Sequence, residues 1–343
     1  VVPAWTILHY DGSSWSAMSS GTNYILYDVW GKNGTNVFAV GNLGTILHYD
    51  GTSWSVMSGG MTNDLEDVWG NSASDVFAVG GSGTILHSDG NSWSAMSSGT
   101  TKALNGVWGS SGSDVFAVGY DGTILHYDGN QWSAMSSGAA DELQAVWGSS
   151  GSDVFAVGVR MILHYDGSSW SEMASGTLSV LMGVWGNSGS DIFAVGTENT
   201  ILHYDGSDWS PRNNPTAEHL LDVWGSSGTD VFAVGTAATV LHYDGSLWSS
   251  IFIPWWGFLN GVWGSSGSDV FAVGTDGMIL HYDGSDWAEM SSGTINHLAG
   301  VWGSSGSNVI AVGDSGMILH YGNELFSGAF ESGGLDGWSL VML

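Results

Sequence analysis

The sequence predicts an all-β fold, an eight-bladed β-propeller of four-stranded antiparallel blades. The tripeptide Val-Trp-Gly recurs eight times, at intervals of 38 or 39 residues. Each repeat divides into four short apolar runs separated by turns rich in Gly, Ser and Asp. Four strands in about 40 residues are typical of one propeller blade.

The repeat from Leu104 to Gly138 shows the four expected strands in order. Its apolar runs are LNGVW, DVFAVG, TILHY and WSAM, and its separators are GSSGS, a short Gly turn and DGNQ. Runs of this length and composition, joined by tight turns, predict hairpin-linked antiparallel strands. One such sheet buries too little apolar surface to be stable alone, so we expect neighbouring blades to stack around an axis.

The two ends of the repeat array predict how the ring closes. The chain begins with a third and a fourth strand, Thr6 to Tyr10 and Trp15 to Met18, and the repeats end with a third strand at Tyr321. We therefore expect the N-terminal strands to complete the last blade. Nine third-strand segments serve eight repeats, and we expect the C-terminal copy, Ile318 to Tyr321, to pair within the ring.

The domain organisation follows from where the repeats stop. Residues 1–321 are expected to form the propeller, and residues 322–343 form a tail that matches no blade. Within the tail, AFESGGLDGWS resembles the opening strand of jelly-roll modules of secreted bacterial proteins. This resemblance implies that the tail is the start of a further, truncated module.

The repeat unit resembles a known group of proteins. The stretch VWGSSGSDVFAVGTDG, followed by MILHYDGSDW, resembles the highly repetitive β-propellers of large bacterial exported and surface proteins. This resemblance implies a bacterial protein that is secreted or displayed on the cell surface. The second-to-fourth-strand pattern is also distantly similar to seven-bladed bacterial lectins, but repeat number, repeat length and the Val-Trp-Gly strand differ, so no lectin residue is carried over.

Composition excludes several classes of partner. The formal net charge is -29, because 33 acidic residues face only 4 Lys and Arg. Nucleic acids and anionic membrane surfaces both require basic residues, so neither is an expected partner. The chain has no Cys, and no apolar run reaches the ~18 residues of a membrane span. We expect no membrane insertion.

No catalytic or metal-binding pattern stands out. Nine of the eleven His occupy one repeated position in the third strand, and third strands of neighbouring blades diverge too far for their imidazoles to share a metal. We expect these His to form structural hydrogen bonds. No nucleophile elbow, phosphate loop or HExxH is found. The sequence therefore predicts a protein that is not an enzyme and has no metal or cofactor.

The repeats vary on two connections that should emerge on one face: the second-to-third-strand turn and the fourth-to-first-strand connection. The largest departure is SSIFIPWWGFLN, residues 249–260, which has the standard length and is expected to keep the standard backbone geometry. Exposed aromatic clusters commonly mark contacts. The candidate ligand-binding or partner-binding residues, all on these connections, are Phe252, Trp255, Trp256, Phe258, Tyr120, Arg160, His219 and His297.

These observations leave two kinds of function open for a non-enzymatic binding module. Trp and Tyr faces could stack on sugars, with the polar residues binding hydroxyls, which predicts glycan binding through the variable connections. The alternative is a protein-docking scaffold or a spacer without a small-molecule ligand. We expect a monomer with a carbohydrate or a protein as its partner.

Overall fold

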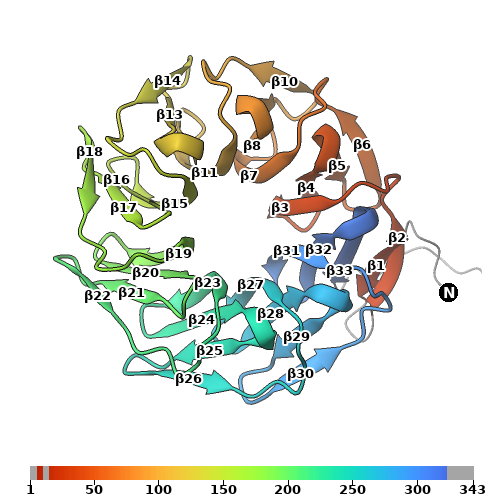
Figure 1. The fold of residues 1–343 in the computed structure, drawn as a ribbon. Helices are drawn as coiled ribbons and strands as arrows, with labels where there is room; N and C mark the ends of the chain where they lie inside the picture. Colours follow the sequence, from red (N-terminus) through yellow and green to blue (C-terminus); the bar gives the residue numbers. More distant parts are fainter. Residues whose placement is uncertain (1–5, 11–14, 323–343) are drawn as a thin grey trace, which may run out of the picture.

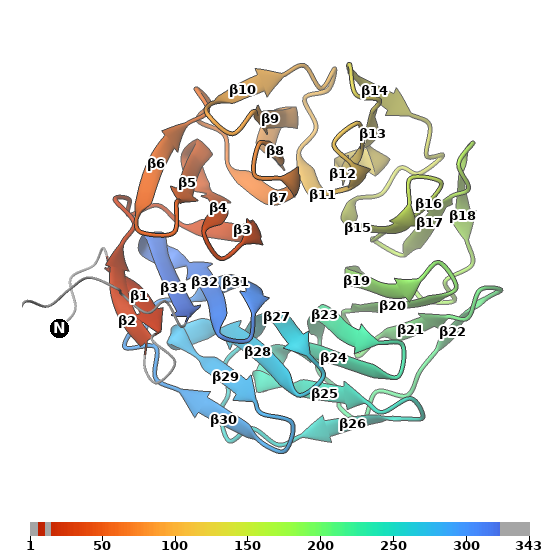
Figure 2. The same ribbon diagram turned by 180° about the vertical axis from the view of Figure 1, so that it is seen from behind.

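The protein is described by a computed structural model that covers residues 6–10 and 15–322. The strands form a ring of radially arranged sheets, with one strand of each sheet at the centre (Figures 1 and 2). Residues 323–343 of the tail, which include the predicted jelly-roll start, lie outside the described residues.

The strands recur in the predicted order. The central strands are β3 (Leu26–Asn33), β7 (Leu65–Ser72), β11 (Leu104–Ser111), β15 (Leu143–Ser150), β19 (Leu181–Ser188), β23 (Leu220–Ser227), β27 (Leu259–Ser266) and β31 (Leu298–Ser305). The second strands are β4 (Asn36–Gly41), β8 (Asp75–Gly80), β12 (Asp114–Gly119), β16 (Asp153–Gly158), β20 (Asp191–Gly196), β24 (Asp230–Gly235), β28 (Asp269–Gly274) and β32 (Asn308–Gly313).

The outer half of each sheet is formed by shorter strands. Those with the third-strand sequence are β1 (Thr6–Tyr10), β5 (Thr45–Tyr49), β9 (Thr84–Ser88), β13 (Ile124–Tyr127), β17 (Met161–Tyr165), β21 (Ile201–Tyr204), β25 (Val240–Tyr243), β29 (Ile279–Tyr282) and β33 (Met317–Gly322). Those with the fourth-strand sequence are β2 (Trp15–Ser19), β6 (Trp54–Ser58), β10 (Trp93–Met96), β14 (Trp132–Met135), β18 (Trp170–Met173), β22 (Trp209–Pro211), β26 (Trp248–Ile251) and β30 (Trp287–Met290).

Short 3-10 turns join most second strands to third strands. They are η1 (Asn42–Gly44), η2 (Gly81–Gly83), η3 (Tyr120–Gly122), η4 (Thr236–Ala238), η5 (Thr275–Gly277) and η6 (Asp314–Gly316).

Seven sheets are regular four-stranded blades made from continuous chain. Blade 1 is β3–β6, blade 2 is β7–β10, blade 3 is β11–β14, blade 4 is β15–β18, blade 5 is β19–β22, blade 6 is β23–β26 and blade 7 is β27–β30. Each is antiparallel throughout, as the sequence predicts; in blade 3, for example, Trp108 of β11 is paired with Phe116 of β12.

The prediction of eight four-stranded blades is wrong, because the eighth repeat supplies only three strands. The remaining sheet has five strands in the order β2-β1-β33-β32-β31 and is assembled from both ends of the described chain. As predicted, β33 pairs with β32 in the ring. The N-terminal copy β1 then pairs with β33 in parallel, with Leu8 opposite Leu319, and displaces β2 to the outer edge. The regular blades therefore number seven, and a composite sheet closes the ring.

The core lies between adjacent blades. In one cluster, Phe77 of blade 2 is fully buried with Leu104, Val115 and Trp132 of blade 3. The central strands add a second repeated contact, in which the Trp of each Val-Trp-Gly covers the Gly of the next. A Cβ atom on Gly148 would lie 2.6 Å from Cη2 of Trp108, and the contact continues to Trp302 on Gly31, which completes the ring.

The outer Trp side chains, at the first residue of the fourth strands, do not all have an acceptor for the indole N–H. Burying an indole N–H without an acceptor is unfavourable, and a fixed register predicts a partner in every blade. Only two of the described outer Trp donate to an acceptor: Trp170 Nε1 lies 3.3 Å from Met135 Sδ, and Trp209 Nε1 lies 3.4 Å from Met173 Sδ. The indole N–H is buried without an acceptor in Trp54, Trp93, Trp132, Trp248 and Trp287.

Candidate functional site

The variable connections lie together on one face of the ring, as predicted. The turn at Asn42 shows why: its N–H donates to Ile25 O in the connection before blade 1, at 2.8 Å. The next N–H, of Leu43, donates to Asp64 Oδ1 in the connection after blade 1, at 2.8 Å. Each turn is thus held between two consecutive connections. We call this surface, formed by the second-to-third-strand turns and the fourth-to-first-strand connections, the variable face.

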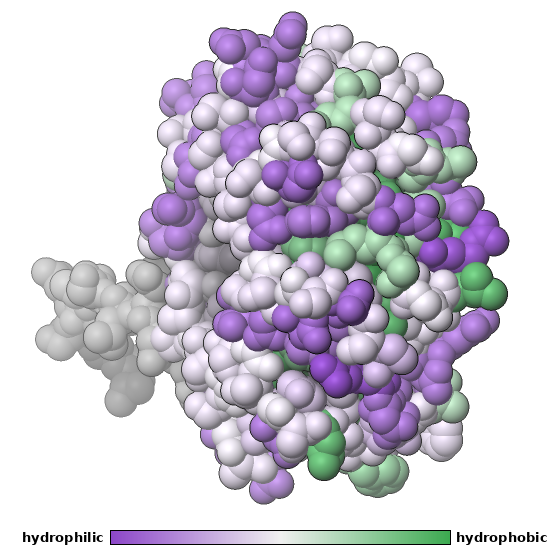
Figure 3. All heavy atoms as spheres, turned by 90° about the vertical axis from the view of Figure 1, so that its left-hand side faces the viewer, coloured by the Kyte–Doolittle hydropathy of each residue, from purple (hydrophilic) through white to green (hydrophobic). Residues whose placement is uncertain are grey.

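Exposed apolar side chains gather on the variable face. Among the described residues, ten large apolar side chains are exposed, and only Val56 and Leu247 lie elsewhere. The other eight are Tyr24, Leu43, Tyr120, Leu178, Phe252, Trp256, Phe258 and Ile295. Figure 3 shows the rim of the ring edge-on, where polar and neutral colours predominate and apolar colours occur in scattered groups.

The aromatic segment contributes the most exposed of these side chains. Phe252 and Trp256 are 87% and 88% exposed, whereas Phe258 is 50% exposed. Trp255 is different, because its ring packs partly against the core cluster between blades 6 and 7. It also covers Gly257, where an added Cβ would lie 1.8 Å from Cη2 of Trp255. The segment therefore has one half-buried ring, that of Trp255, which attaches it to the core, and two exposed rings, those of Phe252 and Trp256.

The prediction that this segment keeps the standard backbone geometry is wrong. Six of the eight connections carry a Gly with φ between +66° and +73°: Gly21, Gly60, Gly99, Gly138, Gly176 and Gly293. In the other two, connections 212–219 and 252–258, Pro215 and Pro254 stand at the aligned position. Proline has φ near -65° and cannot adopt that conformation, so both backbones follow another path.

The turn preceding each of these two connections has changed as well. Five turns end in a Gly with φ between +64° and +72°, at Gly44, Gly83, Gly122, Gly277 and Gly316. At four of these, an added Cβ would lie 2.2–2.3 Å from a carbonyl oxygen of the following connection; the exception is Gly122, at 2.4 Å. The turns before Pro215 and Pro254 carry Asn199 and Ala238 instead. Asn199 and Ala238 keep a positive φ, at +55° and +52°, so a side chain stands there in the left-handed conformation. The eighth turn, Val159–Arg160, is one residue shorter and also lacks the Gly, although the connection after it keeps Gly176.

A hollow of about 330 Å³ lies between the two redirected connections, and we call it the aromatic hollow. It is lined by residues 216–218, 237–240 and 250–256. Ile251, Ile253 and Trp255 pack against the buried cluster between blades 6 and 7, so one wall is continuous with the core. The Ala238 N–H donates to Gly257 O at 2.6 Å, which fixes the turn against the aromatic segment.

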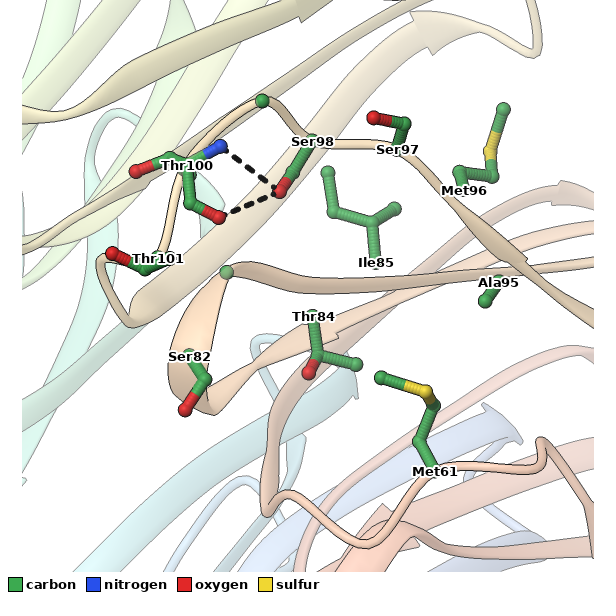
Figure 4. A pocket seen from close by; sticks show the side chains of 12 residues that line it. Met61, Ser82, Thr84, Ile85, Ala95, Met96, Ser97, Ser98, Thr100 and Thr101 are labelled. Atoms are coloured by element: carbon green, nitrogen blue, oxygen red, sulfur yellow. Dashed lines mark hydrogen bonds between the residues drawn. The ribbon is translucent and has the colours of Figure 1, made fainter.

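Blade 2 has a hollow at the corresponding place, with different chemistry. This polar hollow, of about 580 Å³, is lined by Met61 and by residues 82–85 and 95–101 (Figure 4). Ser98 is 8% exposed, and its Oγ donates to Thr100 O at 3.2 Å, as the aligned Ser20 and Ser292 donate in their own connections. Ser and Thr thus occupy positions that carry Ile and Trp in blade 6. The two hollows therefore have the same place in the blade and differ in the polarity of their walls.

The other predicted site residues are spread around the variable face and are mostly engaged with it. Arg160 Nη2 lies 2.8 Å from Asp141 Oδ2. His219 Nδ1 accepts from the Glu198 N–H at 2.8 Å, and His297 Nδ1 accepts from the Asp276 N–H at 3.1 Å. These contacts hold turns to connections. The structure does not bring Arg160, His219 and His297 into one site with the aromatic segment.

Tyr120 is the remaining predicted residue and belongs to blade 3. Its ring is 46% exposed on η3, and the nearby carboxylate of Glu142 raises its pKa. Sequence reasoning missed Leu178 and Ile295, both 84% exposed. They are aligned with Trp256, three residues before the first Leu of a central strand. Aligning that single position across the repeats could have found them.

The repeated His lie toward the opposite face and form hydrogen bonds within their own blades. Their Nε2 lies 2.7–2.9 Å from the Asp that begins the second strand, in the pairs His87–Asp75, His126–Asp114, His164–Asp153, His203–Asp191, His242–Asp230 and His281–Asp269. The ring of His126 also stacks on buried Phe116, with centroids 4.6 Å apart. Ser110 donates to the same carboxylate as His126 and not to the imidazole. The arrangement lacks the hydroxyl-to-imidazole bond of an activated nucleophile.

Three central strands carry an Asp that links adjacent blades: Asp28, Asp67 and Asp222. Asp222 Oδ2 accepts from the Val262 N–H of blade 7 at 2.9 Å, and its Oδ1 accepts from the Val223 N–H at 2.8 Å. Burial raises the pKa of Asp222 to about 6, although these hydrogen bonds oppose the shift. The aligned residues elsewhere are Gly106, Ala145, Gly183, Gly261 and Gly300.

We predict that Asp222→Gly changes how stability depends on pH. The folded state binds the Asp222 proton more tightly than the unfolded chain, whose Asp pKa is about 3.9. The free energy of unfolding contributed by this group is therefore greatest at low pH and falls as pH rises from about 4 to about 6, by up to about 3 kcal/mol. Urea unfolding of both proteins between these pH values should show this fall in the wild-type-minus-variant difference. A difference independent of pH would contradict the prediction.

Two classes of feature were not found in the described part of the chain. Residues 6–10 and 15–322 contain no group of three His, Asp or Glu side chains placed to hold a metal ion. They also contain no helix with the length and hydrophobicity needed to span a membrane.

Comparison with known proteins shows the fold. No family model and no curated protein matches the chain. Solved structures do: a computationally designed protein, Ika8, is 14% identical with a TM-score of 0.74, covering 87% of this chain and 96% of its own. The C-terminal WD40 domain of Sif2 is 10% identical with a TM-score of 0.71, covering 92% and 98%. YCF48 bound to D1 peptide is 16% identical with a TM-score of 0.61, covering 94% and 99%.

These similarities correct one expectation from sequence. The distant similarity to bacterial lectins is not supported, because no family or curated relative matches and none of these three structures is described as a lectin. At 10–16% identity, the three structures share a fold with this chain and transfer no function to it. The chain is an all-β propeller of four-stranded antiparallel blades, similar in architecture to WD40 propellers.

Proposed function

We propose that this protein is a non-enzymatic protein-docking module that binds partner polypeptides through its variable face. One observation carries the proposal: eight of the ten exposed large apolar side chains of the described residues lie on that face. Protein contact surfaces are enriched in aromatic residues at their centres. Similar architecture in YCF48 bound to D1 peptide supports the choice by analogy only.

Glycan binding, the other hypothesis from sequence, explains fewer of these residues. A sugar face stacks on an aromatic ring, so Phe252 and Trp256 suit it. Leu178 and Ile295 are both 84% exposed. Their side chains are aliphatic and have no ring on which a sugar could stack. Protein partners bind aliphatic and aromatic side chains alike, and they therefore account for the whole set. We place the module outside the cell or on its surface, as the repeat sequence suggests, and as a monomer.

Peptide selection tests the proposal. The wild-type protein is used to select binders from a random-peptide display library, and their affinities are measured by fluorescence anisotropy. We expect a face variant with Leu178→Ser, Phe252→Ser, Trp256→Ser and Ile295→Ser to bind the selected peptides at least about tenfold more weakly. A control variant with Val56→Ser and Leu247→Ser, which are exposed elsewhere, should bind like the wild type.

Two outcomes would overturn the docking proposal. One is that the face variant binds the selected peptides as tightly as the control variant. The other is that selection yields no peptide, while a glycan array shows a sugar ligand that is lost with Trp256→Ser. That result would support the glycan hypothesis instead.

A further inference from the structure

We propose that the aromatic hollow binds one bulky apolar side chain of a partner polypeptide and that Glu218 pairs with a Lys or Arg beside it. The inference rests on the proposed docking function and names the chemistry of the partner at one place on the variable face. Four observations carry it: the construction of the two walls, their preorganisation, the charge of the lining and the contrast with the polar hollow.

Both walls of the hollow depart from the repeat in a coordinated way. Connection 212–219 contains Pro215 and connection 252–258 contains Pro254, where the other six connections have Gly. Each Pro is accompanied by loss of Gly from the preceding turn, at Asn199 and Ala238. Two adjacent connections have therefore changed together with their supporting turns. The two connections are consecutive in the ring, so both sets of changes border the same hollow.

The apolar wall is preformed. Trp255 packs both on the core cluster and on Gly257, and the Trp255 N–H donates to Ile253 O at 2.8 Å. Ala238 is 2% exposed and is bonded to Gly257 O. A ligand side chain entering the hollow therefore meets ordered groups, so little conformational entropy is lost on binding. Phe252 and Trp256 lie at the rim of the hollow, where their rings can cover the apolar side chain of the partner.

The lining selects the charge of the ligand. Glu218 is its only ionisable residue, and no Lys or Arg lines the hollow. The Glu218 carboxylate accepts from Thr236 Oγ1 at 2.7 Å, which holds it at the wall. Because the whole chain carries a net charge of -29, an acidic segment would be repelled. A Lys or Arg of the partner, next to its apolar side chain, can interact with the Glu218 carboxylate and with the ring faces of Trp256 and Phe252.

The polar hollow of blade 2 lacks these features. Its connection carries Ser98 and Thr101 where the aromatic segment carries Ile253 and Trp256. The same fold position therefore exists without the aromatic wall. A ligand that recognises only the shape of the fold would bind both hollows, whereas a ligand that needs an apolar anchor and a cation would bind only the aromatic one.

Three labelled decapeptides with a Gly-Ser background test the proposal by fluorescence anisotropy. Their cores are Trp-Lys-Leu-Arg, Trp-Glu-Leu-Asp and Ser-Lys-Ser-Arg. We expect measurable binding only for the first, weakened at least about tenfold by Trp256→Ser. Glu218→Gln should weaken it by about three- to tenfold and reduce its salt dependence, because one charge pair is lost.

Matched variants provide the controls. Val56→Ser, exposed away from the variable face, and Thr101→Ala, at the polar hollow, should leave binding of the first peptide unchanged. Gly257→Ala should weaken it, because the methyl group displaces the Trp255 ring; circular dichroism and the urea midpoint check that this variant folds.

The outcomes separate this proposal from the docking function. Equal binding of the acidic and basic peptides, or no effect of Trp256→Ser and Glu218→Gln, would overturn the proposal. If the display-selected peptides require Leu178 and Ile295 but not Trp256, the docking function stands and the assignment of the hollow falls. If those peptides require no residue of the variable face, both fail.

Discussion

Phe116→Ala is expected to lower the free energy of unfolding by about 3–5 kcal/mol, the largest effect we predict. Phe116 is fully buried between blades 3 and 4. Its ring lies 5.5 Å from that of Tyr165 and 6.1 Å from that of Trp170, both on the next blade. Truncation leaves a cavity at an interface that holds the ring together, and the flanking sheets can relax only partly.

Urea-induced unfolding followed by tryptophan fluorescence measures this loss. The matched control is Tyr120→Ala, a truncation of an exposed aromatic residue in the same blade, which should change stability by less than about 0.5 kcal/mol. A similar loss for both variants would show that the interface between blades 3 and 4 is not a principal source of stability.

Gly277→Ala is expected to cost about 2–4 kcal/mol, even though Ala occurs naturally at the aligned position in blade 6. Gly277 has φ +72°, and a Cβ there would lie 2.3 Å from Thr294 O and 2.8 Å from Ser292 Oγ. The methyl group is therefore strained by its backbone conformation and collides with the following connection. Ala238 has a positive φ as well, at +52°, but its methyl group does not meet the same collision because the connection with Pro254 follows another path.

Ala238→Gly is the companion measurement and should change stability by less than about 1 kcal/mol. The contrast between the two positions tests whether turn and connection are coupled within a blade. If Gly277→Ala unfolds at the same urea concentration as the wild type, the close approach of the turn to Thr294 is not present in solution.

Much of the fold could be predicted because the same pattern of apolar runs and turns recurs in eight repeats. The strand order, the hairpins and the shared face of the variable connections follow from alternating apolar runs and turn residues. The closing sheet was predicted only in part: the pairing of β33 with β32 was expected, but the parallel pairing of β1 with β33, which adds a fifth strand, was not, because β1 and β33 have nearly the same sequence. The partial eighth repeat therefore led to the wrong blade count, since counting motifs does not count completed four-stranded sheets.

The candidate site was only partly predictable, for a different reason. The composition of residues 252–258 identifies the segment, but exposure depends on packing, which makes Trp255 an anchor and leaves Trp256 presented. Pro254 was visible in the sequence, yet its effect requires knowing that the aligned Gly residues have positive φ. The pairing of His219 and His297 with neighbouring turns was equally hidden, because it joins residues about 20 positions apart.

The packing of Trp on Gly between central strands is the same at every blade boundary. Each repeat contributes a Trp ring to one boundary and a Gly to the other. Such head-to-tail interfaces allow whole repeats to be exchanged without redesigning their neighbours. The aromatic hollow differs, because its walls come from two consecutive connections. The smallest unit that can carry this site is therefore two consecutive repeats in a fixed order. Inserting an ordinary repeat between them would separate the two walls of the hollow, although every blade boundary would be preserved.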